Sequence, residues 1–322
     1  HYFNDEIDGQ VNVTLAERQP GSSLKPLVYL TAFEQGYRPD TMLFDLTTNF
    51  ASAGDDYRPL NYDLEERGPV TIRQALAGSL NIPAVKSLYL AGLDNVVKLA
   101  KDFGYTTLGD RDRYGLSLVL GGGEVKLLEH VNAYASFARE GVYKDSLPIL
   151  AIEDSEGKEI EDNKDNKGRR ILDKDKVRLL NDILSDNAAR SYVFGESNYL
   201  TLPDRPVAAK TGTTNDYRDS WTIGFTPQIA LGVWAGNNDN SAMSNGASGS
   251  QVAGPIWNKV MRELTKNLPV AGFAKTELNS CRKPMVCGEL SDEEIIKIDK
   301  MSGLLATEYT PYTQIEERKY CN

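Results

Sequence analysis

Three short stretches, "RPVAAKTGT" (205–213), "DSWTIGFTP" (219–227) and "QIALGVWAGN" (228–237), follow one another in the second half of the sequence. Each is an apolar run bounded by turn residues, a pattern typical of consecutive antiparallel strands. The next segment, "GPIWNKVMRELTKNL", has the pattern of a helix that begins at Pro255. We therefore expect a three-stranded antiparallel meander closed by a helix.

Upstream of the meander, helical patterns dominate. The first follows Pro20 and Gly21 in "QPGSSLKPLVYLTAFEQGY" and ends at Gly36, and Pro26 is expected to distort its first turn. The predicted helices are 22–35, 71–77, 83–90, 93–103, 125–140 and 173–184. The order of elements predicts a mixed α+β fold, an antiparallel sheet flanked by helices with a helical subdomain.

Two segments are predicted to be irregular. Residues 153–175 are dense in Asp, Glu, Lys and Asn, which indicates a solvated hairpin and linker. The stretch "SNGASGSQ" (244–251) is expected to be a flexible loop.

The composition is that of a globular protein, with 40% hydrophobic and 25% charged residues in a chain of 322. The formal net charge of −10 argues against nucleic acid as a partner, because phosphate backbones require a basic surface. The sequence has no apolar run of about 18 residues and no signal-peptide pattern. It opens at His1 without an initiator methionine, so we expect a fragment or a processed chain.

The three cysteines, Cys281, Cys287 and Cys321, all lie in the C-terminal tail. This distribution fits an oxidising compartment in which a peripheral tail is cross-linked. Cys281 and Cys287 are candidates for a short-loop disulfide, with free thiols as the alternative. A zinc site is a weaker prediction, because neither histidine lies near this tail.

Ser22 and Lys25 are about one helical turn apart, so their side chains can share a face at the start of the first helix. Unpaired N–H groups and the helix dipole at this end would stabilise an oxyanion. A partly desolvated lysine with a lowered pKa can activate a serine by taking its proton. Ser23 faces Pro26 at the same spacing and has no such partner. An S-x-x-K pair by itself is more often a polar helix cap.

Two further motifs lie downstream. Ser79 and Asn81 in "GSLNIPAV" supply a hydroxyl and an amide that can relay a proton and hold a substrate amide, although such pairs are usually helix caps. The more specific "KTGT" begins at Lys210, directly after a strand pattern. In it Gly212 would let a ligand approach the strand closely, and lysine with threonine can bind a carboxylate.

In this order, S-x-x-K, S-x-N and K-T-G match the motif set of penicillin-binding proteins and class A β-lactamases. The chain resembles the transpeptidase domain of class A bifunctional penicillin-binding proteins over nearly all of residues 2–311. Further stretches that carry the resemblance are "EIDGQVNVTLAERQPGSSLKP", "YGLSLVLGGGEV", "LPDRPVAAKTGTTNDYRDSWTIGFTP" and "SGLLATEYTP". The fold implied is that of penicillin-binding proteins and serine β-lactamases.

The resemblance implies a role for each motif residue. Ser22 would be acylated by a D-alanyl-D-alanine stem peptide or by a β-lactam, with Lys25 as its base. Ser79 would pass a proton to the departing D-alanine, and Asn81 would contact the peptide amide and help to position Lys25. An amine from a neighbouring stem peptide would then resolve the acyl-enzyme and leave a cross-link.

The K-T-G strand would hold the substrate. Lys210, Thr211 and Thr213 would bind the terminal carboxylate, and the backbone N–H groups of Ser22 and Thr213 would form the oxyanion hole. The donor peptide would lie along the strand that contains Gly212, in the manner of strand addition. The resemblance implies neither a metal nor an organic cofactor.

The resemblance also implies a domain organisation. We expect a transpeptidase domain at 1–267 and a tail with three cysteines at 268–322. Family members carry a membrane anchor, a glycosyltransferase domain and the first strands of the sheet ahead of this region, so these are expected upstream of residue 1. The implied location is the extracytoplasmic face of the bacterial cell membrane, with other cell-wall synthesis proteins as candidate partners.

Other patterns compete with these motifs. Ser155 and Lys158 repeat S-x-x-K in a charged turn that has no apolar face. The "SDN" at 185–187 is closer to the form of this motif in β-lactamases, but it ends a predicted helix, so we interpret it as structural. Glu159 has the spacing of the deacylating glutamate of β-lactamases, yet it lies in the acidic linker. A Ser-His-Asp triad is not supported, because His130 is expected on a core-facing helix.

Two other functions remain open at this point. A serine carboxypeptidase or a β-lactamase would resolve the acyl-enzyme with water instead of an amine. A penicillin-binding sensor, from another class of protein, would be acylated without turnover.

Overall fold

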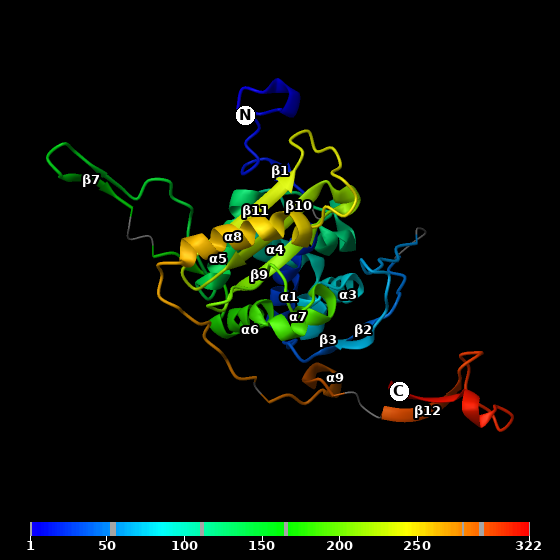
Figure 1. Cartoon of the computed structure of the whole chain (residues 1–322). Helices are drawn as coiled ribbons and strands as arrows, with labels where there is room; N and C mark the ends of the chain where they lie inside the picture. Colours follow the sequence, from blue (N-terminus) through cyan, green and yellow to red (C-terminus); the bar gives the residue numbers. More distant parts are fainter. Residues whose placement is uncertain are drawn as a thin grey trace.

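The computed structural model describes residues 2–51, 56–109, 113–163, 167–278, 280–289 and 293–321. At its centre is a three-stranded antiparallel sheet in the order β11-β10-β9 (Figure 1). Its strands are β9 (Ala208–Thr213), β10 (Asp219–Phe225) and β11 (Ala230–Gly236). In the register, Lys210 lies opposite Ile223 and Thr213 opposite Ser220. The predicted meander is confirmed, and the middle strand β10 is buried along its whole length.

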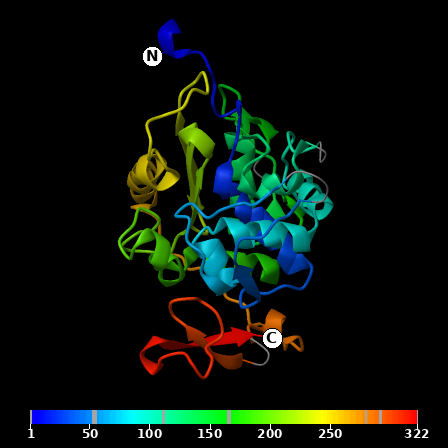
Figure 2. The same cartoon turned by 90° about the vertical axis from the view of Figure 1, so that its right-hand side faces the viewer.

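Helices cover both faces of this sheet, as the view along its edge in Figure 2 shows. On one face lies α8 (Gly254–Thr265), whose Trp257 and Met261 pack against apolar residues of β9 and of the segment before it. The larger core lies on the other face, between the sheet and the remaining helices. The predicted mixed fold, a sheet flanked by helices with a helical subdomain, is confirmed.

The predicted helices are present with small shifts at their ends. They are α1 (Lys25–Glu34), α2 (Ile72–Ala77), α3 (Asn81–Ala91), α4 (Leu93–Asp102), α5 (Leu127–Ala138) and α6 (Lys174–Ser185). The first begins as a 3-10 turn, η2 (Gly21–Leu24), and α1 follows with Pro26 as its second residue. Proline is tolerated there, because the first N–H groups of a helix have no partner within it. A further helix, α7 (Asn187–Phe194), was not predicted.

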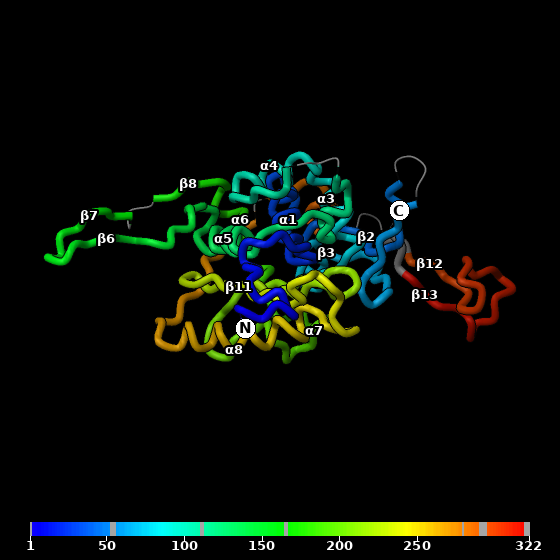
Figure 3. The backbone as a smooth tube through the Cα atoms, turned by 90° about the horizontal axis from the view of Figure 1, so that it is seen from above, coloured from blue at the N-terminus to red at the C-terminus, as the bar shows by residue number. Residues whose placement is uncertain are grey.

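Short strand pairs surround this body. They are β1 (Glu17–Arg18) with β4 (Val125–Lys126), β2 (Met42–Asp45) with β3 (Gly68–Thr71), β5 (Val142–Tyr143) with β8 (Arg169–Arg170), and β6 (Ala151–Glu153) with β7 (Glu159–Asp162). The β6–β7 pair is the predicted solvated hairpin, and it projects away from the body (Figures 1 and 3). Short 3-10 turns are η1 (Asp5–Ile7), η4 (Gly115–Leu120), η5 (Asn215–Tyr217) and η7 (Tyr312–Gln314).

The predicted loop at 244–251 is wrong for its last residues. A π-helical turn, η6 (Gly249–Ala253), begins there and leads into α8. A Cβ on Gly249 would lie 2.4 Å from the Trp221 carbonyl oxygen and 2.5 Å from that of Gly212, so the absence of a side chain lets this turn pack onto the sheet. The sequence pattern, rich in Gly and Ser, conceals this packing.

Beyond α8 the chain continues as a tail. Its elements are α9 (Pro284–Cys287), β12 (Glu293–Asp299) and β13 (Ile315–Cys321), the last two paired as a hairpin that lies apart from the body in Figure 3. Cys281 and Cys287 form a disulfide with a Cα–Cα distance of 5.5 Å, as predicted. Within the described residues, no cluster of three or more His, Cys, Asp and Glu side chains could hold a metal ion. None of the described helices is long and apolar enough to cross a membrane.

Candidate active site

Ser22 lies in a segment held by glycines on both sides. Gly21 has a φ of +54°, and a Cβ on it would be 2.5 Å from the Thr213 carbonyl oxygen. A Cβ on Gly212 would be 2.2 Å from the Pro20 carbonyl oxygen, and one on Gly121 would be 2.4 Å from the Gly21 nitrogen. Backbone therefore packs directly on backbone around the serine. From the sequence we expected Gly212 to let a ligand approach the strand closely. In the structure, the missing side chain of Gly212 instead makes room for the segment that carries Ser22.

Lys25 is fully buried and points away from solvent into a ring of oxygen atoms. Its Nζ donates to the carbonyl oxygens of Ser79, at 2.6 Å, and Leu80, at 3.1 Å. It also donates to Asn81 Oδ1 at 2.7 Å and reaches Ser79 Oγ at 3.5 Å. Burial, and then the charge of Lys210, lower the pKa of Lys25 well below its usual value.

Ser79 and Asn81 lie at the junction of α2 and α3. The amide of Leu80 donates to the Ala75 carbonyl and that of Ser79 to the Leu76 carbonyl, which closes the end of α2. This cap holds Ser79 at a φ of +59°, a left-handed conformation that is uncommon outside glycine. The cap also turns the Ser79 carbonyl and hydroxyl toward the lysines.

A second layer of polar residues fixes Asn81. Asn61 Oδ1 accepts from the main-chain N–H of Asn81 at 2.8 Å, and Asn61 Nδ2 donates to both oxygens of the buried Asp45 at 2.8 and 2.9 Å. Asn81 Nδ2 donates to the Leu60 carbonyl at 2.8 Å, so its Oδ1 must face Lys25. Neither Asp45 nor Asn61 belongs to a motif, and the sequence analysis missed both.

Lys210 approaches Ser79 from the sheet. Its Nζ donates to Ser79 Oγ at 2.7 Å and to the Thr211 carbonyl at 2.9 Å, and the side chain is buried. Burial, and then the charge of Arg190, lower the pKa of Lys210 to about 7. On the same strand, Thr213 Oγ1 accepts from the Gly249 amide at 2.9 Å. The Ser79 hydroxyl thus lies between two buried lysines.

These groups meet at a cleft of ≈ 860 Å³. Of the predicted site residues, five line the cleft: Ser22, Ser79, Asn81, Thr211 and Thr213. Lys25, Lys210 and Gly212 lie beneath them. The structure therefore brings all eight predicted site residues together.

Several cleft residues were not singled out from the sequence. Tyr62 and Tyr217 lie on opposite segments of its rim, with their hydroxyls 2.9 Å apart. Ser117, Ser248 and Ser250 also line it. Ser117 lies in "YGLSLVLGGGEV", a stretch that carries the family resemblance, so it could have been predicted to lie near the site. No local sequence pattern indicates that Tyr62 and Tyr217 line the cleft.

The competing motifs lie elsewhere. Ser155 is in the exposed turn between β6 and β7, and Glu159 is exposed on β7. The Ser185 hydroxyl donates to the Asn181 carbonyl of its own helix at 2.8 Å, and Asp186 caps α7 by accepting from the Ala189 amide. None of these residues lines the cleft.

Ser23 has no lysine one helical turn away, as expected, but it has a hydrogen-bond partner far away in the sequence. Its Oγ lies 2.8 Å from Nε2 of the buried His130, and His130 Nδ1 lies 2.6 Å from the Tyr105 hydroxyl. Ser23 Oγ donates its single proton to the Pro20 carbonyl at 2.6 Å, so Nε2 must be the donor in this pair and Nδ1 accepts from Tyr105. Burial also lowers the pKa of His130 to about 3. This group is a core hydrogen-bond chain with no aspartate, as expected for a structural histidine.

A sheet covered on both faces by helices, with a serine and two buried lysines at one cleft, is the arrangement of the penicillin-binding protein and serine β-lactamase fold class. The family model of the penicillin binding protein transpeptidase domain matches residues 10–262. The chain belongs to this family. It is 37% identical to penicillin-binding protein 1A of Aquifex aeolicus over 261 residues, which are 80% of this chain and 35% of that protein. The chain thus spans about a third of the length of this relative.

Solved structures share the fold. Penicillin-binding protein 1A of Haemophilus influenzae superposes with a TM-score of 0.71 at 23% identity, over 96% of this chain and 49% of that one. PonA1 of Mycobacterium tuberculosis in complex with penicillin V gives a TM-score of 0.73 at 24% identity, over 83% and 75% of the two chains.

Proposed function

We propose that this chain is the D,D-transpeptidase domain of a peptidoglycan synthase and acts through an acyl-enzyme on Ser22. The observation that carries the proposal is that Ser22 lines the same cleft as Ser79 and Asn81, both of which bond the buried Lys25, in a family of transpeptidases. The Ser22 hydroxyl attacks the carbonyl of the penultimate D-alanine, and its proton passes to Lys25. Terminal D-alanine leaves with a proton relayed through Ser79, and an ester to Ser22 remains.

The second half of the reaction restores the enzyme. An amine of a neighbouring stem peptide attacks the ester, the new amide bond forms, and Ser22 regains its proton as the C–O bond breaks. Asn81 keeps Lys25 in place through its 2.7 Å hydrogen bond. No step requires a metal or an organic cofactor.

Substrate binding is proposed to use the K-T-G strand. Lys210, Thr211 and Thr213 would bind the terminal carboxylate, and the backbone N–H groups of Ser22 and Thr213 would receive the oxyanion. β9 is an edge strand of the described sheet, which leaves one side for a donor peptide to add as a further strand. β-Lactams would acylate Ser22 in place of the peptide, since they carry a reactive carbonyl and a carboxylate.

Ser22 should be the only serine labelled by a fluorescent penicillin. The labelled protein is digested and the modified peptide is mapped by mass spectrometry. Ser23 is fully buried with its proton engaged, so Ser23→Ala should still be labelled whereas Ser22→Ala should not. A label on Ser23, Ser79 or Ser155 would disprove the assignment.

Ser79→Ala should slow acylation by about 10²- to 10⁴-fold, the usual contribution of a general acid–base group. Ser185→Ala is the matched control and should leave the rate nearly unchanged, since that hydroxyl is bonded to its own helix. Because Ser79 has a positive φ, Ser79→Gly should show the same loss without backbone strain. Stopped-flow acylation rates decide the matter; a slow Ser185→Ala beside a normal Ser79→Ala would mean that "SDN" is the functional motif.

Incubation with a stem-peptide analogue separates this function from its alternatives. With an acceptor amine present, a transpeptidase yields cross-linked peptide. A D,D-carboxypeptidase releases the shortened free acid, a β-lactamase hydrolyses penicillin instead, and a sensor gives one stoichiometric acylation. Cross-linked product that appears only with the amine is the expected result.

We further propose that the domain ends near residue 267, where α8 gives way to the disulfide-bearing tail, with the catalytic part in 1–267 and 268–322 outside it. A glycosyltransferase domain, a membrane anchor and the remaining sheet strands would belong to the longer protein. The proposed location is the extracytoplasmic face of the bacterial cell membrane, where stem peptides and β-lactams are accessible. Other cell-wall synthesis proteins are the proposed macromolecular partners.

A further inference from the structure

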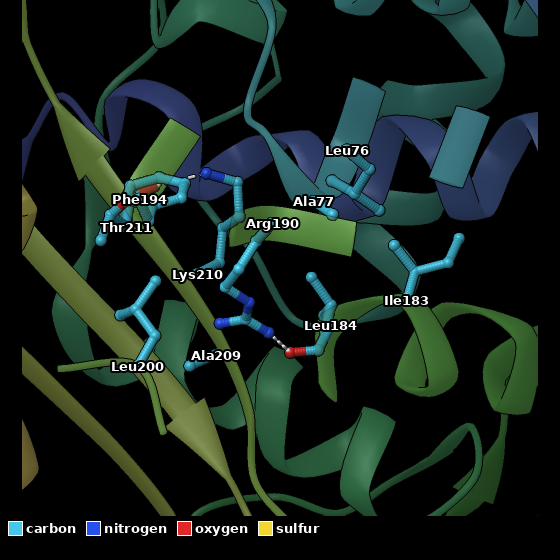
Figure 4. Close-up of a pocket in the computed structure, with 10 residues that line it drawn as sticks. All are labelled: Leu76, Ala77, Ile183, Leu184, Arg190, Phe194, Leu200, Ala209, Lys210 and Thr211. Atoms are coloured by element: carbon cyan, nitrogen blue, oxygen red, sulfur yellow. Dashed lines mark hydrogen bonds between the residues drawn. The ribbon is translucent and has the colours of Figure 1, made fainter. Parts of the chain in front are cut away.

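Arg190, on the unpredicted helix α7, is buried beneath the K-T-G strand. Only 2% of the residue is exposed, and it shares the wall of a small cavity with Lys210 (Figure 4). The cavity measures ≈ 10 Å³, about the room that one water molecule needs. In Figure 4 the Arg190 guanidinium is directed toward the Leu184 carbonyl, and the Lys210 side chain runs the other way, toward the Thr211 carbonyl.

Among the described residues, no carboxylate forms an ion pair with Arg190. Its contacts are the main-chain carbonyls of Leu184 and, at 3.5 Å, Asp186, while Nη1 is buried without a partner in the described part of the chain. The Asp186 carboxylate is engaged elsewhere, in an ion pair with Arg73 at 2.9 Å and in the cap of α7. Burial lowers the pKa of Arg190 to about 10, so the guanidinium stays charged at neutral pH.

Two basic groups therefore face Lys210, and the Arg190 guanidinium is the one that stays charged. Lys25 faces it from α1 and Arg190 from α7, whereas Ser79, at the end of α2, offers only a hydroxyl. β10 places Ile223 opposite it. Asp186, at the junction of α6 and α7, is the nearby acid whose charge acts on Arg190. Like charges in a buried site disfavour protonation of the weaker base, and a lysine loses its proton far more readily than an arginine.

We propose that Arg190 is a positioning residue that, together with burial, lowers the proton affinity of Lys210 while the cleft is empty, so that binding of a carboxylate is coupled to proton uptake by Lys210. This inference rests on the carboxylate-binding role proposed for Lys210. The incoming carboxylate supplies the negative charge that the buried cations lack, and a proton from solvent then completes the ion pair. An anionic ligand thus creates its own cationic partner, and the empty site avoids a second buried charge beside Arg190.

Proton uptake during acylation tests the coupling. When penicillin acylates Ser22, the serine proton moves to the lactam nitrogen, so the bond changes alone are proton-neutral. A pH-indicator dye in weak buffer reports any net uptake, and the adduct is counted independently by fluorescence. At pH 8 the wild type should take up about nine-tenths of a proton per adduct, as a group with a pKa near 7 would. Acylation without uptake would overturn the inference and leave the proposed function intact, whereas absence of the adduct would overturn the function.

Substitutions of Arg190 test whether this residue sets the pH dependence of proton uptake. In Arg190→Met, the pH at which uptake is half-maximal should rise by about one unit, the scale of a nearby charge. Arg190→Gln, which keeps a donor for the Leu184 carbonyl, should do the same if the methionine variant folds poorly. Leu184→Met alters the same cavity wall without changing charge and should leave the midpoint in place. An unchanged midpoint in both Arg190 variants, or an equal shift in Leu184→Met, would contradict the proposed role.

Discussion

Lys25→Met should reduce the rate of Ser22 acylation by about 10²- to 10⁴-fold, because it removes the proposed general base and keeps a side chain of similar length. The expected loss follows from the position of Nζ, which bonds Asn81 and two main-chain carbonyls and reaches Ser79 Oγ. Fluorescent-penicillin labelling measured over time gives the rate. Lys98→Met, on the exposed surface of α4, is the control and should behave as the wild type. Full activity of Lys25→Met would show that another group takes the serine proton.

Lys25→Met should also change how the free energy of unfolding depends on pH. Lys25 and Lys210 both have lowered pKa values in the folded state, so between about pH 7 and 10 the unfolded chain binds more protons than the folded one. Stability should therefore rise with pH across this window and be lost as the pH falls toward 7. Lys210 contributes a slope of about 1.4 kcal/mol per pH unit above its folded pKa, and Lys25 adds to this slope. Denaturant titrations at pH 7.5 to 9 should show a smaller slope in Lys25→Met than in the wild type. An unchanged slope would mean that Lys25 keeps its proton on folding.

The penicilloyl adduct on Ser22 should outlast many catalytic cycles. Deacylation by water needs a base beside the ester, and its absence costs about 10²- to 10⁴-fold. The only carboxylate among the cleft-lining residues of the described chain is that of Asp216, which is exposed to solvent. Glu159, the residue with the β-lactamase spacing, lies on the projecting β7 strand. The amine released when the lactam ring opens also stays tethered where an acceptor must approach.

The measurement is the decay of labelled protein after excess penicillin is removed. Glu159→Gln should decay as slowly as the wild type, since its position leaves no path to the ester. Loss of the label within seconds would favour the β-lactamase alternative over the transpeptidase. A decay that quickens only when an acceptor amine is added would instead show that the tethered amine does not block the site.

Local sequence patterns were enough to predict much of the fold. The meander of β9, β10 and β11 follows from short apolar runs between turn residues, and the helices from apolar periodicity with Gly and Pro at their ends. Helix α7 was missed because its pattern is weak, and its one buried residue is an arginine. The π-helical turn at Gly249 was missed because glycine indicates a loop unless the surface it packs against is known.

The sequence alone determined the residue types of the site, because S-x-x-K, S-x-N and K-T-G are local patterns whose spacing can be read along the chain. The sequence also favoured one copy of S-x-x-K and of S-x-N over its competitor, and the tertiary structure showed that these copies face the cleft. It joined Lys25 to Ser79 and Ser79 to Lys210, and placed the Ser185 hydroxyl against its own helix. It also revealed partners without a motif, the Asn61–Asp45 support and Arg190 beneath Lys210. The physical reason is that burial and charge–charge distances depend on residues far apart in sequence, and these set the proton affinity of a lysine more strongly than its neighbours along the chain.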